Sequence, residues 1–100
     1  MSSNPLDVIK DADAALFEQV TNVRELAFQE GALSQKHKIL IALAIDTVEH
    51  SEGGIRSLAM QALQAGATRE EIMETLRVAY HICGVGCIYA AARGLQGVFD

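Results

Sequence analysis

Apolar residues recur at intervals of three and four along most of the chain, and no stretch alternates between apolar and polar residues. This spacing places apolar side chains on one face of an α-helix, whereas a half-buried strand would show alternation. The first series starts after Asn4 and Pro5, a pair typical of a helix start, and predicts one long helix that ends at Gly31. Its apolar face consists of Val8, Ile9, Ala12, Leu16, Val20, Val23 and Ala27.

Two further helices are predicted in the middle of the chain. Ser34 is positioned to cap the second helix, and Gly53 and Gly54 are expected to break its pattern. Gly66 supplies a left-handed residue at the end of the third helix. The apolar face of the second helix consists of Leu40, Ile41, Ala44, Ile45 and Val48, and that of the third of Ile55, Leu58, Ala59, Ala62 and Leu63.

The clearest helix start lies in the segment GATREEI. Thr68 and Glu71 have the spacing of a capping box, and Glu70 and Glu71 suit the positive end of the helix dipole. This fourth helix is predicted to turn Ile72, Leu76, Ala79 and Cys83 inward, and a last helix runs from about residue 85 to residue 99. The sequence therefore predicts an all-α fold, a bundle of about five helices in a single domain over residues 1–100.

The composition indicates that one copy of the chain has a small core. Half of the 100 residues are apolar, but only 5% are aromatic and many are alanine, so each buried side chain covers little area. A small domain hides only about 60% of its unfolded surface by itself. We therefore expect further burial between subunits and predict a homo-oligomer.

The charge of the chain excludes some partners. The net charge is −5 and the basic residues are scattered, so nucleic acid, whose binding depends on neutralised phosphates, is not an expected partner. The N-terminus lacks the basic start and apolar run of a signal peptide, which favours a cytoplasmic protein. The longest mostly apolar run, residues 78–92, is shorter than the about 20 residues that span a bilayer, so no membrane segment is predicted.

Both cysteines of the chain lie in the segment CGVGC. On a continuous helix Cys83 and Cys87 would share a face with nearly parallel side chains, which is poor geometry for a disulfide. Gly84 and Gly86 could interrupt the helix, turn the sulfurs toward each other and place a thiol at a helix start that lowers its pKa. The alternative is two small buried thiols in a helix contact. The residues alone leave both interpretations open.

Glu49 and His50 end the second predicted helix and are the other candidates for chemistry. A neutral imidazole there can act as an acid or a base near physiological pH, or it can simply be a solvated histidine at a helix C-terminus. His81 and Cys83, two residues apart, point to opposite sides of a helix and cannot share a metal ion on a regular helix. We therefore expect neither a bound metal nor a cofactor.

The segment around AGATREEI resembles a known family. The pattern A..AGATREEI.ET, followed by a turn that contains glycine, is similar to the carboxymuconolactone decarboxylase superfamily, which includes the alkylhydroperoxidase D-like proteins, and the resemblance covers roughly residues 33–95. It implies an alkylhydroperoxidase D-like helical fold that assembles into trimers or hexamers. It also implies two chemistries, the thiol-dependent reduction of peroxides and the decarboxylation of a small carboxylated lactone.

The chain departs from the family pattern at the usual reaction centre. Redox members have C-x-x-C-x-x-x-H before the AGAT segment and a glutamate further upstream. These positions fall on Ser51, Gly54 and Leu58, with the glutamate on Ile39. Decarboxylase members, by the same resemblance, keep a histidine at the position of Leu58. The usual peroxidase centre is therefore absent from its place in this sequence.

Three functions remain open from the sequence. The first is a thiol-dependent oxidoreductase of the alkylhydroperoxidase or peroxiredoxin type, with Cys83 and Cys87 as a displaced pair and His50 as proton carrier. The second is a lyase in which Glu49 and His50 move protons and Arg56 holds a carboxylate. The third is a catalytically silent oligomer that binds a small molecule or another protein. Nothing in the chain identifies a substrate.

Overall fold

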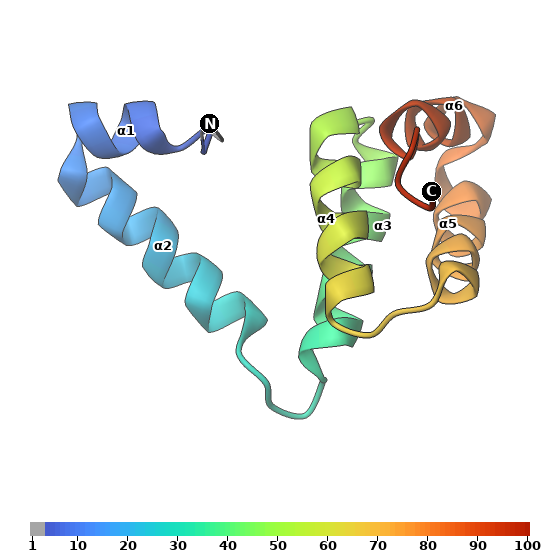
Figure 1. Ribbon diagram of the computed structural model, residues 1–100, viewed down its shortest axis with the longest axis horizontal. Helices are drawn as coiled ribbons and strands as arrows, with labels where there is room; N and C mark the ends of the chain where they lie inside the picture. The colour runs from blue at the N-terminus through green and yellow to red at the C-terminus, as the bar shows by residue number, and fades with distance from the viewer. Residues whose placement is uncertain (1–3) are drawn as a thin grey trace.

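The computed structural model describes residues 4–100, and the regular secondary structure of those residues is helical. Helices α3 to α6 pack into a bundle, whereas α1 and α2 form an arm that points away from it (Figure 1). The elements are α1 (Asp7–Ala12), α2 (Ala14–Phe28), α3 (Gln35–Val48), α4 (Glu52–Gln64), α5 (Arg69–Cys83) and α6 (Val85–Gly94). The predicted all-α class is confirmed, and residues 4–100 form six helices in place of about five.

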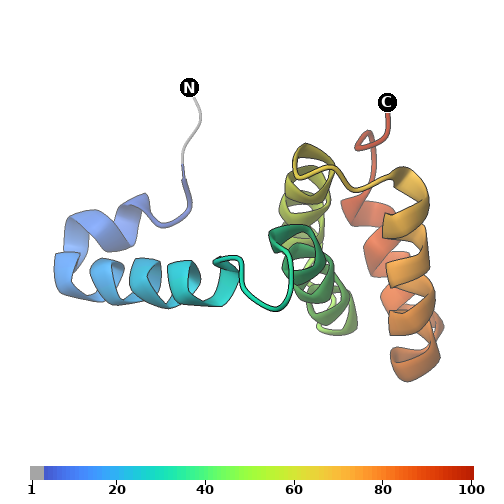
Figure 2. The ribbon, with the colours of Figure 1, turned by 90° about the horizontal axis from the view of Figure 1, so that it is seen from below.

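The arm differs from the single long helix that the sequence predicts. The chain leaves the helical conformation at Asp13, whose carboxylate accepts a hydrogen bond of 3.0 Å from the backbone N–H of Leu16 and so starts α2 anew. None of the residues of α1 and α2 is buried, so the predicted inward face from Val8 to Ala27 is wrong. These residues stay unburied because most of the arm lies away from the bundle, as the second view in Figure 2 also shows.

Helix α3 begins where the sequence predicts but turns a different face inward. The hydroxyl of Ser34 accepts a hydrogen bond of 3.2 Å from the N–H of His37, which confirms the predicted cap. The buried residues of α3 are Ile39, Leu43 and Thr47, whereas Ile41, Ile45 and Val48, predicted to be inward, are exposed. Helices α4 and α5 both pack on α3, and they cover the first of these two stripes.

Helix α4 starts earlier than expected. Gly53 and Gly54 lie in its first turn, so they do not break the helical pattern as predicted. The break falls instead at His50, which has a φ angle of 60°. The buried residues Ile55, Ala59 and Ala62 belong to the predicted face, and Gly66 ends the helix with the expected positive φ angle, 97°.

The predicted capping box of α5 is confirmed. The N–H of Glu71 donates to the hydroxyl of Thr68 at 3.0 Å, and the N–H of Thr68 donates to the Glu71 carboxylate at 2.8 Å. The same carboxylate pairs with Lys36 of α3 at 3.0 Å. The hydrogen bond from the Thr68 backbone lowers the pKa of Glu71 most, and the one from Lys36 lowers it further. The residues buried from α5 are the predicted Ile72, Leu76 and Ala79.

Helix α6 follows α5 after one residue and ends earlier than predicted. Gly84, with a φ angle of 81°, separates the two helices, and α6 ends at Gly94 rather than near residue 99. The carbonyl of Gln96 in the segment that follows accepts a hydrogen bond from Arg56 of α4. Arg93 pairs with Glu52 at 2.6 Å, so α6 is tied to the start of α4.

The core lies between α3, α4, α5 and α6. Alanine supplies many of its members, which lets the helices approach closely, as the composition predicts. Within residues 4–100, no helix combines the length and the apolar character that crossing a membrane requires. The central buried cluster consists of Ile39, Leu43, Ile55, Ala59, Ala62, Ala67, Ile72 and Ala90.

Candidate functional site

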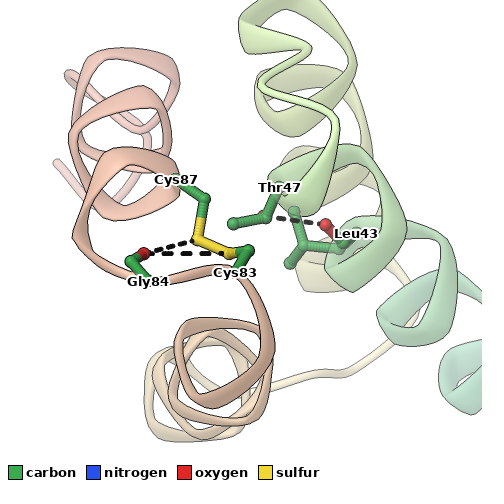
Figure 3. Close-up of a disulfide and its surroundings, with 5 residues drawn as sticks. All are labelled: Leu43, Thr47, Cys83, Gly84 and Cys87. Atoms are coloured by element: carbon green, nitrogen blue, oxygen red, sulfur yellow. Dashed lines mark hydrogen bonds between the residues drawn. A yellow bond between two sulfur atoms is a disulfide. The ribbon is translucent and has the colours of Figure 1, made fainter.

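A disulfide joins Cys83 and Cys87 across the turn between α5 and α6. Cys83 is the last residue of α5, and Gly84 then reverses the direction of the chain with its positive φ angle. The two Cα atoms are 6.3 Å apart, within the range of about 4.4–6.8 Å that disulfides require. The sequence left open an interrupted helix with facing sulfurs or two buried thiols in a helix contact, and the structure shows the first. Figure 3 shows the sulfurs facing each other across the turn.

The two sulfurs differ in their surroundings. Cys83 is half-buried, whereas Cys87 is fully buried at 0% exposure. Cys87 lies in the first turn of α6, where free backbone N–H groups stabilise a thiolate. The carbonyl oxygen of Gly84 lies 3.1 Å from its sulfur and can accept a hydrogen bond once Cys87 is reduced to a thiol. An incoming reagent therefore reaches the pair through Cys83.

Residues of helix α3 lie beside the disulfide (Figure 3). Thr47 is fully buried there, and its hydroxyl donates to the carbonyl of Leu43 at 2.8 Å. The hydroxyl proton is thus used within α3, and Thr47 serves as packing beside the sulfurs. Sequence reasoning missed this residue, although its spacing of four from Leu43 places it on the buried stripe of α3.

His50 occupies a backbone position that glycine normally fills. The N–H of Ser51 donates to the carbonyl of Asp46 at 2.9 Å and that of His50 to Thr47 at 3.1 Å, which is a Schellman motif with His50 as its left-handed residue. The same pair of bonds ends α4, where the left-handed residue is Gly66. A residue other than glycine costs about 1–2 kcal/mol in this conformation. Such an outlier points to a role for the side chain.

The imidazole of His50 lies against the turn that carries the disulfide. Its Cε1 and Nε2 atoms are 3.4 and 3.9 Å from the position that a Cβ atom would take at Gly86. Gly86 lies between the two cysteines in the sequence, so His50 contacts the segment that the disulfide closes. Glu49 precedes His50, is exposed, and makes no hydrogen bond or ion pair through its side chain in the described part of the chain.

Asp46 fills the space where the family pattern would place its second cysteine. A Cβ atom at Gly54 would overlap the Asp46 carboxylate, so the two residues are in direct contact. Burial, and then the charge of Glu49, raises the pKa of Asp46. Sequence reasoning missed Asp46, because its proximity to Gly54 arises only when α3 and α4 pack together.

Replacing Asp46 by asparagine is expected to stabilise the protein at neutral pH. Because the folded state raises the pKa of Asp46, its ionisation opposes folding above the usual carboxyl range and has no effect below it. The gain of Asp46→Asn over the natural chain should therefore be present at pH 7 and vanish near pH 3. Urea unfolding of both proteins across this range measures it, and a gain that is independent of pH would contradict the assignment.

The remaining candidate residues lie elsewhere. The guanidinium of Arg56 donates to the carbonyl of Gln96 and is thereby directed to the C-terminal segment rather than to Glu49 and His50. His81 is exposed in the last turn of α5. In residues 4–100, no group of three histidine, cysteine or acidic side chains is arranged to hold a metal ion.

The helical fold and the segment AGATREEI with its following glycine turn are typical of one protein family, and the comparison with known families supports the same assignment. The chain belongs to the carboxymuconolactone decarboxylase family, whose sequence pattern it matches over residues 14–96. The predicted membership is thus confirmed. The match also includes α2, which lies outside the segment that carried the resemblance.

Relatives of the chain support this membership. The crystal structure of apo-lpg0406, a carboxymuconolactone decarboxylase family protein from Legionella pneumophila, has a TM-score of 0.86 and 30% identity, covering 91% of this chain and 81% of that one. "Uncharacterized protein 4 in cox locus" of Paracoccus denitrificans is 33% identical, with 89% of this chain and 79% of the relative aligned. "Uncharacterized protein MJ1511" of Methanocaldococcus jannaschii is 27% identical over 75% of this chain and 70% of its own length.

Proposed function

We propose that the protein is a thiol-dependent oxidoreductase that reduces peroxides with Cys83 and Cys87, with His50 as proton carrier. One observation carries the proposal: a half-buried sulfur is joined to a fully buried one at a helix start, and the imidazole of His50, a residue with a left-handed backbone, contacts Gly86 between the two cysteines. A reactive cysteine needs access, and a partner thiol needs protection until it closes the disulfide. The pair meets both needs at a place that differs from the family's usual centre.

The oxidative half of the reaction starts from the dithiol. His50 accepts the thiol proton of Cys83, and the resulting thiolate attacks the outer oxygen of the peroxide. The O–O bond breaks, the leaving alkoxide takes the proton from His50 to become an alcohol, and Cys83 becomes a sulfenic acid. Cys87 then attacks the Cys83 sulfur, the S–O bond breaks, and the hydroxide leaves with the Cys87 proton as water. The products are an alcohol, water and the disulfide.

An external dithiol restores the reduced state. One of its thiolates attacks the accessible sulfur of Cys83, the S–S bond breaks, and Cys87 leaves as a thiolate. The helix start of α6 stabilises that charge, and thiols of lower pKa leave faster. The second thiolate of the dithiol attacks the mixed disulfide and releases Cys83, while the two protons of the dithiol end on Cys83 and Cys87. We also propose that the protein is cytoplasmic, because the reducing cytoplasm supplies such thiols.

The other two functions have less support. A lyase would need a cation near Glu49 and His50, but Arg56 is engaged by the carbonyl of Gln96. A silent binding protein would not require histidine rather than glycine at the end of α3. Glu49 is exposed next to His50 and remains part of the proposed site as a neighbouring carboxylate.

Thiol titration tests the proposal directly. The protein is reduced with dithiothreitol, freed of the reagent, and its thiols are counted before and after one equivalent of an organic hydroperoxide. We expect both cysteine thiols to disappear while one equivalent of alcohol forms. Unchanged thiols, or loss no faster than that of free cysteine, would rule the proposal out.

Two substitutions at His50 separate its chemistry from its backbone strain. His50→Gly should raise the free energy of unfolding by about 1 kcal/mol, because glycine adopts the left-handed conformation without penalty. The same variant should slow thiol oxidation roughly tenfold, less than the 10²–10⁴ of a full general acid or base, because thiols ionise readily. Stopped-flow oxidation and urea unfolding measure the two effects.

The matched control is His50→Asn, since asparagine tolerates this conformation but does not titrate. Both variants should slow the oxidation by the same factor, because neither side chain can carry a proton. A structural role alone would leave the oxidation rate of His50→Asn unchanged, and that outcome would remove His50 from the site.

A further inference from the structure

A cavity of about 350 Å³ lies between α2, α3 and α4. Gly54 and Leu58 are among its lining residues, at positions where the family pattern has a cysteine and a histidine, so the family's usual chemistry cannot run in it. Pockets for small molecules start at about 300 Å³. The cavity therefore has room for a small ligand of another kind.

This cavity is separate from the disulfide. Cys83 ends α5 and Cys87 lies in the first turn of α6. Figures 1 and 2 both show α2 on one side of α3 and α4, and α5 and α6 on the other side. A ligand in the cavity would thus leave the sulfurs accessible.

The cavity has one basic and one acidic side chain, Arg24 and Asp46. Within residues 4–100 the ion pairs join other residues, so neither charge is neutralised by the protein. Burial, and then the charge of Glu49, raises the pKa of Asp46, because both make its negative charge unfavourable. A cation beside Asp46 would relieve both effects.

The guanidinium of Arg24 is held at the cavity by two contacts. It donates to the amide oxygen of Gln61 at 3.1 Å and lies 5.6 Å from the centre of the Phe28 ring. A guanidinium has five N–H donors in a planar fork that matches a carboxylate, so donors remain for a ligand. The amide of Gln61 in turn donates to the hydroxyl of Ser57 at 2.9 Å, which leaves the proton of that hydroxyl available for the same carboxylate.

The two charges belong to opposite ends of the cavity. Gln61, which accepts from Arg24, lies further along α4 than Gly54, which contacts Asp46. The distance along the helix axis is about two turns, or about 10 Å. Leu58 lies between Gly54 and Gln61 on α4 and gives this part of the cavity an apolar wall.

We propose that the cavity binds a small ω-amino acid, a molecule with an ammonium group at one end of a short aliphatic stem and a carboxylate at the other. The ammonium pairs with Asp46, the carboxylate accepts hydrogen bonds from Arg24 and Ser57, and the stem packs on Leu58. A ligand with a single charge leaves one of the two protein charges without a partner, which is costly where water is partly excluded. The site goes beyond the redox proposal, because it uses neither cysteine nor His50.

Calorimetric titration at neutral pH with three probes tests the class of ligand. 6-Aminohexanoate carries both charges, whereas hexanoate and hexylamine carry one each on a stem of the same carbon number. We expect one 6-aminohexanoate per chain and a Kd about tenfold lower than that of either other probe, the factor of one hydrogen bond to a charged group. Absence of binding at millimolar concentration, or equal affinity for the three probes, would overturn the proposal.

Two substitutions assign the ends of the ligand. Arg24→Leu should weaken the binding of 6-aminohexanoate to that of hexylamine, and Asp46→Asn should weaken it to that of hexanoate. The matched control is Arg77→Leu, which removes the same charge from an exposed position on α5 and should leave the three affinities unchanged. Circular dichroism checks that each variant keeps its helices.

Two results with these variants would also overturn the proposal. One is an unchanged affinity for 6-aminohexanoate in Arg24→Leu or in Asp46→Asn. The other is an equal loss in Arg77→Leu, which would show that net charge and not this cavity determines binding. These measurements use the oxidised protein and no peroxide, so their outcome is independent of the redox proposal.

Discussion

Replacing Cys83 by serine is expected to reduce peroxide consumption to the rate of the protein-free reaction, and replacing Cys87 by serine is expected to slow it, because dithiothreitol must then take the place of the resolving thiol. A serine hydroxyl neither ionises near neutral pH nor forms a disulfide, so the cycle loses its nucleophile or its resolving group. Both substitutions keep the size of the side chain, and the Gly84 carbonyl, 3.1 Å from the Cys87 sulfur, can accept a hydrogen bond from the hydroxyl in Cys87→Ser as it can from the reduced thiol. Catalytic consumption of cumene hydroperoxide with dithiothreitol as reductant measures the loss.

The two variants should differ in the chemistry of the thiol that remains. Cys87→Ser leaves the half-buried Cys83, which should react readily with thiol reagents and, with a peroxide but no added thiol, stop at a sulfenic acid. Cys83→Ser leaves the fully buried Cys87, which should be labelled at a rate limited by opening of the fold.

Mass spectrometry of iodoacetamide labelling, with and without urea, compares the two thiols. Urea should equalise their rates, because unfolding exposes both. Faster labelling of Cys87 in the folded protein would reverse the proposed order of the two cysteines. Full activity of either single variant would exclude the disulfide from the reaction.

Substituting Gly94 is expected to give the largest loss of stability in the bundle. A Cβ atom there would lie 2.9 Å from the backbone carbonyl oxygen of Glu52 and 2.9 Å from Cγ2 of Ile55. Neither neighbour can move easily, because Ile55 is fully buried and the carbonyl belongs to the start of α4. Gly94→Ala should therefore lower the free energy of unfolding by about 1–3 kcal/mol, as overpacked cores do.

Gly53→Ala is the matched control. Gly53 lies in the first turn of α4 with no atom within 4 Å of the added Cβ position, so the helix preference of alanine acts alone. This variant should be more stable than the natural chain by up to about 1 kcal/mol. Urea unfolding of both variants measures the difference. Equal effects at the two positions would show that α4 and α6 are not in close contact at Gly94.

Three helix ends could be predicted residue by residue. The cap at Ser34, the capping box of Thr68 with Glu71 and the left-handed Gly66 all lie where the sequence places them. These features depend on hydrogen bonds between residues three to five positions apart, which neighbouring helices hardly change. The break at Asp13 has the same local origin, but its carboxylate was overlooked within a long apolar pattern.

The sequence could predict which residues belong to the candidate site, but not which of them contact one another. The cysteines, the glycine beside them and the histidine at a helix end can be chosen by residue type. That His50 rests on Gly86, and that Asp46 fills the space at Gly54, depends on how α3 meets α6 and α4. No spacing within one helix contains this information, because the contacts join residues from separate elements.

The sequence by itself determined an all-helical chain, most of its helix starts and its family, and it supplied the candidate residues for chemistry. Only the tertiary structure decided which apolar stripe of α3 is buried, that the predicted apolar face of α2 is not, and that Cys83 and Cys87 are paired. The physical reason is that periodicity defines the faces of a helix, whereas burial depends on which face a neighbour covers. On α2, no element within residues 4–100 buries the predicted apolar face.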